Sequence, residues 1–344
     1  MRGLSLIGIL LAAITLAGAA TAQDEAGFQS YLQDVRGRAI AQGVRPATAD
    51  QVLADLTYNQ RVIDLDRSQP GGNPANPTSA TITPFAPYLR SHVDAARISQ
   101  GRTKYLAERG HLARIETQTG VPESIMVAIW GHETNYGRIM GNFDLPRSIA
   151  TLAYEGRRRS LFEPELIAMM KMVDRGVSRG QLVGSWAGAM GGPQFLPSVY
   201  LRLARDGDGD GRADIWNSDA DTLASIGNYF YQAGWRRGQP WGLAVSLPAG
   251  FDRSGVTNRL ISPRCPRVFA RQSAWRSIGE WRALGVLSQG KPWPADNVQA
   301  TVIEPDGPGQ TAYLLTGNYR VILDYNCSNF YALSVGLLAD AVER

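Results

Sequence analysis

Apolar residues recur at helical spacing over most of the first 235 residues of the chain. This period predicts helices within 28–66 and again within 88–118. The intervening stretch 69–77 holds three prolines and two glycines and predicts a loop. A further helix is expected to start near Pro122, because proline suits the first turn and Glu123 places an acid near the positive helix end. Helical periodicity then continues to about Trp235.

The pattern changes after Trp241, where short runs rich in β-branched and aromatic residues begin. Strands are expected at four places, namely 243–247, 301–303, 312–315 and 319–323. A helix over 277–284 interrupts these strands, and an amphipathic helix over 330–342 closes the chain. The pattern therefore predicts an α+β protein, mainly α, with a small α+β insertion near the C-terminus.

The composition is that of an ordinary globular protein. Of 344 residues, 44% are hydrophobic and 19% charged, which excludes disorder, collagen and coiled coil as descriptions of the whole chain. The formal net charge of +4 is too small for a dedicated nucleic-acid-binding protein, and we expect no nucleic acid as partner. Such a charge is compatible with work beside an anionic polymer or envelope surface.

The first 22 residues have the pattern of a secretory signal peptide. Arg2 precedes an apolar run over 4–16, and Ala20-Thr21-Ala22 provides an A-x-A cleavage site before Gln23. The run is shorter than the roughly 20 residues that span a bilayer, which argues against the alternative of a membrane anchor. No cysteine lies at the cleavage site and no later segment is apolar enough to cross a membrane. We therefore expect an exported, periplasmic protein that is cleaved after Ala22 and carries neither a lipid anchor nor a membrane span.

The chain has two cysteines, Cys265 and Cys327. In an oxidising compartment two thiols can form one disulfide. The sequence favours this bond, and two buried free thiols are the alternative.

Glu133 is the leading candidate for a catalytic acid. Ile125, Ile129 and Glu133 fall four residues apart on one helical face, so the carboxyl group is in register with an apolar stripe in the last helical turn. Burial and the negative helix end both disfavour the charged form and raise the pKa of the carboxyl, as a general acid near neutral pH requires. The alternative is an acid that emerges at a helix end and pairs with an arginine.

Zinc and serine-triad chemistry have little support. The three histidines, His92, His111 and His132, have no ligand spacing with another histidine or a cysteine. The His132-Glu133 pair lacks the second histidine of the zinc-protease helix, and no G-x-S-x-G elbow occurs.

The segment 206–217 follows an EF-hand pattern in part. Asp206, Asp208 and Asp210 occupy positions one, three and five, with Gly211 at six, the Arg212 carbonyl at seven and Asp214 at nine. Position twelve is Asn217 in place of the usual glutamate, so Asp219 or Asp221 would have to substitute. The pattern favours a structural Ca²⁺ site, and a solvated acidic turn is the alternative.

Several segments together resemble the lytic murein transglycosylase B family. They are Trp130–Gly137 around Glu133, Gly184–Pro197, the loop Asp206–Trp216 and the closing Tyr325–Tyr331. The resemblance runs from about Phe28 to the C-terminus and implies a lysozyme-like helical core with an added helical region. It also implies non-hydrolytic cleavage of the β-1,4 bond between N-acetylmuramic acid and N-acetylglucosamine in peptidoglycan, leaving 1,6-anhydromuramoyl ends.

The resemblance also implies roles for individual residues. Glu133 matches the single catalytic acid/base, Ser185 and Gln194 match residues lining the cleft, and Arg157 and Arg158 match an arginine pair associated with the glycan and its peptide stem. The saccharide wall would be formed by Tyr229, Tyr325, Asn326 and Tyr331, with Tyr88 as a weaker match. Leu161 and Gly192-Pro193 depart from the family pattern, which leaves details of the subsites open.

These observations predict five regions and one main function. The regions are a signal peptide (1–22), an N-terminal helical region (23–120), a lysozyme-like catalytic core with the EF-hand-like loop (121–241), a small α+β region (242–324) and a C-terminal helix returning to the core (325–344). The expected partner is the peptidoglycan glycan strand, with cell-wall synthesis or divisome proteins as candidate protein partners and no catalytic cofactor. The alternatives are a goose-type lysozyme-like muramidase, which is a hydrolase, and a non-catalytic glycan-binding protein.

Overall fold

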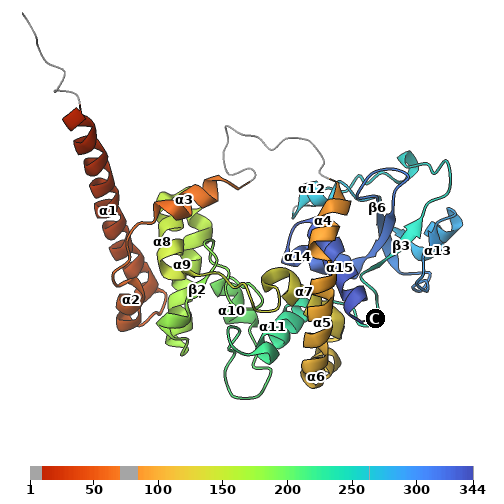
Figure 1. The fold of residues 1–344 in the computed structure, drawn as a ribbon, viewed down its shortest axis with the longest axis horizontal. Helices are drawn as coiled ribbons and strands as arrows, with labels where there is room; N and C mark the ends of the chain where they lie inside the picture. Colours follow the sequence, from red (N-terminus) through yellow and green to blue (C-terminus); the bar gives the residue numbers. More distant parts are fainter. Residues whose placement is uncertain (1–9, 70–83, 263, 344) are drawn as a thin grey trace, which may run out of the picture. The chain divides into compact units, whose positions relative to one another are not determined.

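The structure is a computed structural model that describes residues 10–69, 84–262 and 264–343 (Figure 1). It is mostly helical with small antiparallel sheets, which confirms the predicted mainly-α fold class. By their internal contacts the residues fall into two compact units, one formed by 1–79 with 140–202 and the other by 80–139 with 203–344. This division does not follow the sequential regions expected from the sequence, and the five-region organisation stays a prediction.

Unit 1 is built from helices and one short hairpin. Its elements are α1 (Leu10–Ala41), α2 (Pro46–Leu53), α3 (Gln60–Arg67), β1 (Phe143–Asp144), α8 (Leu145–Glu155), α9 (Arg159–Asp174), the 3₁₀ turn Arg179–Gln181, β2 (Val183–Gly184) and α10 (Pro197–Leu203), whose last residue belongs to unit 2. The predicted apolar face of α1 is confirmed, because Phe28, Leu32 and Val35 are buried where α1 packs on α8 and α9. The predicted cleavage site falls within α1, residues 1–9 of the signal peptide lie outside the described residues, and so does most of the predicted loop at 69–77.

The helices of unit 2 surround α7. They are α4 (Phe85–His92), α5 (Ala95–Ala107), α6 (Arg109–Thr119), α7 (Glu123–Thr134), α11 (Asp219–Gln232), α14 (Gly317–Tyr325) and α15 (Asn329–Glu343). Helix α7 packs against α5, α6, α11 and α15, and its residues 124–131 are all buried. A helix that is apolar all round is expected at the centre of a core. Because α7 is buried up to Gly131, the position of the polar residues that follow, including Glu133, is fixed.

A five-stranded antiparallel sheet completes unit 2. The strands are β3 (Gly242–Ser246), β4 (Arg276–Ser277), β5 (Leu287–Ser288), β6 (Gln299–Ile303) and β7 (Ala312–Thr316), in the order β4-β6-β7-β3-β5. The chain between them also forms α12 (Pro266–Phe269), α13 (Ile278–Ala283) and the 3₁₀ turn Ser254–Val256. The predicted strands at 243–247, 301–303 and 312–315 and the helices at 277–284 and 330–342 are confirmed to within one residue at most boundaries.

One predicted strand is wrong, because residues 319–323 lie inside helix α14. Thr316 caps the start of this helix, and its hydroxyl accepts a hydrogen bond from the Asn318 amide at 3.2 Å. Tyr319, Ile322 and Leu323 then follow at helical spacing and are fully buried. Local β-propensity is therefore overridden by a cap and by tertiary packing. Among the described residues, no helix combines the length and apolarity needed to span a membrane.

Candidate active site

Glu133 lies in the last turn of α7, where the backbone is tightly constrained. Helix α7 ends with Asn135, Tyr136 and Gly137 in succession in the left-handed region, at φ of 49°, 59° and 83°. Tyr136 folds back over Gly131, where an added Cβ would lie 2.6 Å from its ring. The Tyr136 hydroxyl donates to the Arg97 carbonyl at 2.9 Å. These contacts fix the turn that carries Glu133 and explain why residue 131 has no side chain.

The Glu133 carboxyl meets a buried tyrosine of α15. The Tyr331 hydroxyl donates to Glu133 Oε1 at 2.5 Å, and the Ser334 hydroxyl donates to the Tyr331 carbonyl at 2.8 Å. Burial raises the pKa of Glu133 to about 7, and the bond from Tyr331 opposes this rise because it favours the carboxylate. At neutral pH the group is therefore divided between its acid and its base form.

The neighbouring histidine adds no charge to this environment. Burial lowers the pKa of His132 to about 3, so the imidazole is neutral at pH 7. Its ring lies 5.6 Å from that of Tyr331 and 6.1 Å from that of His92, which in turn stacks on Tyr88 at 3.8 Å. A cation in this place would lower the pKa of Glu133, and a neutral ring avoids that effect.

Two more of the expected wall residues lie close together in unit 2. The rings of Tyr229 and Tyr325 are 4.7 Å apart, and the Tyr229 hydroxyl donates to the Asp324 carbonyl at 2.9 Å. Burial raises the pKa of Tyr325 well above its usual value, and the nearby charge of Glu133 adds to this rise. Asn326 is exposed at the C-terminal end of α14. Unit 2 thus brings Glu133 together with Tyr331 and places Tyr325 within its electrostatic reach.

The remaining expected residues belong to unit 1. Ser185 accepts the Ala189 amide at 3.0 Å, and Gln194, itself left-handed with φ 52°, donates to the Gly191 carbonyl at 3.0 Å. Backbones approach closely here, because a Cβ at Gly184 would lie 2.2 Å from the Ala189 carbonyl oxygen. The glycine-rich segment therefore forms a compact backbone turn that presents Ser185 and Gln194.

Sequence reasoning missed Asp66, which binds both arginines of the expected pair. Asp66 is buried on α3, with Arg157 on one carboxylate oxygen and Arg158 on the other, the latter at 2.9 Å. These residues are separated by more than 90 positions, so no local pattern reveals the contact. Asp66 thus holds the two arginines side by side.

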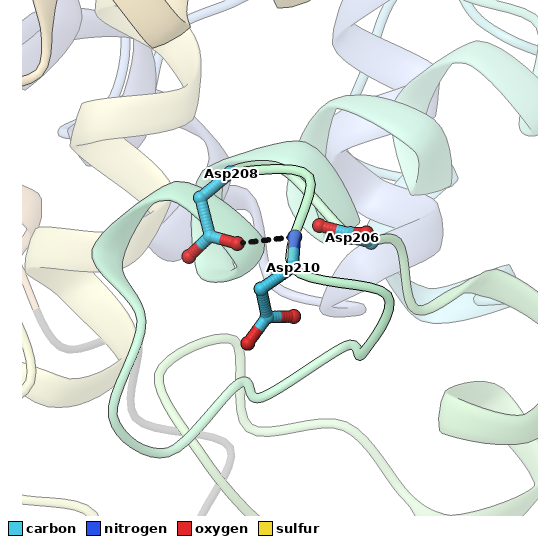
Figure 2. Close-up of side chains that lie close together, drawn as sticks. All are labelled: Asp206, Asp208 and Asp210. Atoms are coloured by element: carbon cyan, nitrogen blue, oxygen red, sulfur yellow. Dashed lines mark hydrogen bonds between the residues drawn. The ribbon is translucent and has the colours of Figure 1, made fainter.

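The acidic loop gathers three of its carboxylates. One carboxylate oxygen from each of Asp206, Asp208 and Asp210 lies within 4.8 Å of the others, and all three residues are exposed (Figure 2). Asp214 and Asp221 are not part of this cluster. Asp214 accepts the backbone amides of Trp216 and Asn217, and Asp221 accepts those of Gly207 and Asp214. Three clustered carboxylates are the hard oxygen donors that Ca²⁺ prefers, so these residues fit such an ion.

Comparisons with known proteins identify the family of this chain. The family model described as Transglycosylase SLT domain matches residues 27–340. Membrane-bound lytic murein transglycosylase B of Escherichia coli is 30% identical over 296 residues, covering 85% of this chain and 76% of that protein.

Solved structures show the same fold. SltB3 from Pseudomonas aeruginosa, in complex with NAG-anhNAM-pentapeptide, has a TM-score of 0.81 at 39% identity and covers 92% of this chain and 79% of that one. The Escherichia coli lytic transglycosylase Slt35, solved with bulgecin A and with calcium, has a TM-score of 0.72 at 27% identity, with 93% of both chains covered. The predicted lysozyme-like fold and family are confirmed, and the chain belongs to the Transglycosylase SLT domain family as a lytic transglycosylase acting on peptidoglycan.

Proposed function

We propose that Glu133 alone supplies both proton transfers in non-hydrolytic cleavage of the β-1,4 bond between N-acetylmuramic acid and N-acetylglucosamine. The observation that carries this proposal is the environment of its carboxyl group. Among the described residues, the influences that set the pKa of Glu133 are burial and the Tyr331 hydroxyl, and no second carboxylate is among them. Glycoside hydrolases normally need two carboxylates, one as acid and one as base or nucleophile.

In the first step Glu133 acts as the acid. Its proton passes to the glycosidic oxygen, the bond from this oxygen to C1 of the muramoyl residue breaks, and the N-acetyl group stabilises the cationic centre at C1. A pKa of about 7 keeps a large fraction of Glu133 protonated near neutral pH, where an ordinary glutamate would be ionised. General acid catalysis of this kind contributes about 10² to 10⁴-fold to the rate.

In the second step the resulting carboxylate acts as the base. It takes the proton of the C6 hydroxyl on the same sugar, whose oxygen closes onto C1 and forms the 1,6-anhydro ring. The acid form of Glu133 is thereby regenerated, and no water is consumed. Because the nucleophile belongs to the substrate itself, it has a high effective concentration.

The tyrosines and the unit 1 residues would bind the substrate. We assign Tyr229, Tyr325, Asn326, Tyr331 and Tyr88 to the saccharide wall. Tyr331 bonds Glu133, and Tyr325 lies within reach of its charge and packs on Tyr229. Asn326 follows Tyr325 directly, and the ring of Tyr88 stacks on His92. We assign Ser185, Gln194, Arg157 and Arg158 to glycan and stem-peptide binding on the basis of their motifs and of the fixed geometry that Gly184 and Asp66 give them.

We further propose that the acidic loop binds a structural Ca²⁺. Asp206, Asp208 and Asp210 would supply the clustered carboxylates, and the Arg212 carbonyl would add a fourth oxygen. Asp214 and Asp221 would complete the site from the same segment, where the Asp214 amide donates to the Asp221 carboxylate. The ion would stabilise the loop that leads into α11, and all reaction steps would remain with Glu133. This role agrees with a donor set of protein oxygens, which leaves little room for an activated water.

The location is proposed as periplasmic, with export through the signal peptide and cleavage after Ala22. Arg2, the apolar run and the A-x-A site support this location. Proteins of cell-wall synthesis or division remain predicted partners.

The proposal is tested with Glu133→Gln and a control on the same helix, Glu123→Gln. The first variant should keep its fold and its binding to purified murein sacculi and should lose at least about 10²-fold in muropeptide release. The control should release muropeptides at the wild-type rate. Release by Glu133→Gln at more than a tenth of the wild-type rate would contradict the assignment.

A further inference from the structure

A pocket of unit 2 whose lining does not include Glu133 has an excess of positive charge. It has a volume of about 620 Å³, and among the residues that line it are Arg236, Arg264, Arg320, Phe269, Trp275 and Asp324. Asp324 is the only acid in this lining, and it already pairs with Arg264 at 3.2 Å. The pocket therefore keeps two arginines, Arg236 and Arg320, that have no acidic partner among the described residues.

Arg320 is held in place by aromatic rings. Its guanidinium carbon lies 4.6 Å from the centre of the Phe269 ring and 5.9 Å from that of Trp275. Contacts with the faces of aromatic rings fix the guanidinium plane and leave its in-plane N–H groups available for hydrogen bonding. A positioned guanidinium with free donors suits a carboxylate, which it can bind through two parallel hydrogen bonds.

Helix α14 forms one side of this pocket and favours an anion there. Gly317, Arg320, Val321 and Asp324 line the pocket from a single helical face. Gly317 lies at the positive N-terminal end of the helix. A Cβ added to Gly317 would meet only Gln239 Nε2, at 3.5 Å. A ligand can therefore approach the helix end closely, and negative charge is favoured at that point.

The same helix links the pocket to the saccharide wall. At its C-terminal end, the Asp324 carbonyl accepts both the Tyr229 hydroxyl and Arg264 Nη2, at 2.9 and 2.7 Å, and Tyr325 follows directly. Gly317 and Tyr325 are eight residues apart, which corresponds to about 12 Å along the helix axis. An extended pentapeptide spans about 17 Å and can cover that distance.

We propose that this pocket binds the carboxylates of the peptidoglycan stem peptide. The inference rests on the proposed function, because it takes the glycan to lie along Tyr229 and Tyr325. A stem peptide attached to the muramoyl residue carries several carboxylates and can extend along α14, where Arg236 and Arg320 receive one of them. The pocket would thus select strands that still carry their peptides.

The proposal is tested by calorimetric titration of the full chain with two synthetic stem pentapeptides. One carries free carboxylates and the other has them amidated. The wild type should bind the free-acid form at least about tenfold more tightly. The double variant Arg236→Gln/Arg320→Gln should lose most of this difference and keep only the part that Arg157 and Arg158 contribute. The control is Arg267→Gln, an exposed arginine of α12 that lies outside the pocket lining and should keep it.

A kinetic arm compares peptide-bearing glycan strands with strands stripped of their peptides by an amidase. The wild-type preference for peptide-bearing strands should fall about tenfold in the double variant, and Arg236→Gln alone should reproduce part of this loss if the double variant fails to fold. Equal binding of both pentapeptides by the wild type would overturn the proposal and would favour an acidic segment of a protein partner as the ligand. Failure of the wild type to form anhydro products would refute the proposed function but leave the titration decisive for the pocket.

Discussion

We expect the Tyr331 hydroxyl to set the upper pH limit of the reaction. The variant Tyr331→Phe removes this hydroxyl. The hydroxyl donates to Glu133 Oε1 at 2.5 Å and so favours the carboxylate. A hydrogen bond to a charged group contributes about 1.5–3 kcal/mol, and one pKa unit corresponds to about 1.4 kcal/mol. Its removal should therefore raise the pKa of Glu133 from about 7 by roughly one to two further units.

The expected observation follows from the role of Glu133 as the acid in the free enzyme. Activity should decline on the alkaline side as Glu133 loses its proton, so the basic limb of kcat/KM should lie near pH 7 in the wild type. In Tyr331→Phe this limb should move upward by about one to two pH units. The assay is the initial rate of muropeptide release at limiting substrate over a range of pH.

A matched control separates this effect from the general loss of a tyrosine hydroxyl. Tyr105→Phe removes a hydroxyl that bonds another carboxyl group, that of Glu123, and it should leave the basic limb in place. A limb that does not move in Tyr331→Phe, or that moves to lower pH, would refute the assigned balance between burial and the hydrogen bond.

Three further predictions concern stability. The pKa of Glu133 is raised from 4.5 to about 7 in the folded state, so the stability of the protein should fall as pH rises through this window. In denaturant titrations, Glu133→Gln should therefore be about 3 kcal/mol more stable than the wild type at pH 8 and no more stable below pH 4.5. Excess chelator should lower the melting temperature of the wild type, and Ca²⁺ should restore it. The melting temperature of Asp208→Asn should respond to neither. If the wild-type melting temperature does not change, the loop binds no ion. A disulfide joins Cys265 and Cys327, with 5.6 Å between the Cα atoms and a sequence separation of 62. Replacing both cysteines by serine should cost about 4 kcal/mol of stability and weaken glycan binding, and a loss below about 1 kcal/mol would contradict this prediction.

The burial of Glu133 and its raised pKa could be predicted from the sequence because their signal is local. Ile125 and Ile129 set the helical face, and both are buried as expected. The partner that controls its ionisation could not be predicted from pattern, since Tyr331 lies 198 residues away. Asp66 was not predicted for the same reason. In the sequence it is one acidic residue within a polar stretch, and only the structure places Arg157 and Arg158 beside it.

The errors in secondary structure have a similar cause. Residues 319–323 carry β-branched and aromatic side chains that favour a strand, and only the Thr316 cap and the packing of Tyr319 and Ile322 favour the helix. The short strands β1, β4 and β5 have two residues each and no alternating pattern long enough to detect. The arginine pocket combines the loop after α11 with residues of α12, β6 and α14, so it too becomes visible only in three dimensions.

The most direct test of the mechanism proposed for Glu133 is the chemistry of the newly formed sugar ends. Purified murein sacculi are digested in heavy-oxygen water, and the released muropeptides are analysed by mass spectrometry, with Glu133→Gln as the control. We expect 1,6-anhydromuramoyl ends without incorporated heavy oxygen and almost no product from the control. Reducing muramoyl ends that carry heavy oxygen would show a hydrolase of the muramidase type and would contradict the single-residue mechanism assigned to Glu133.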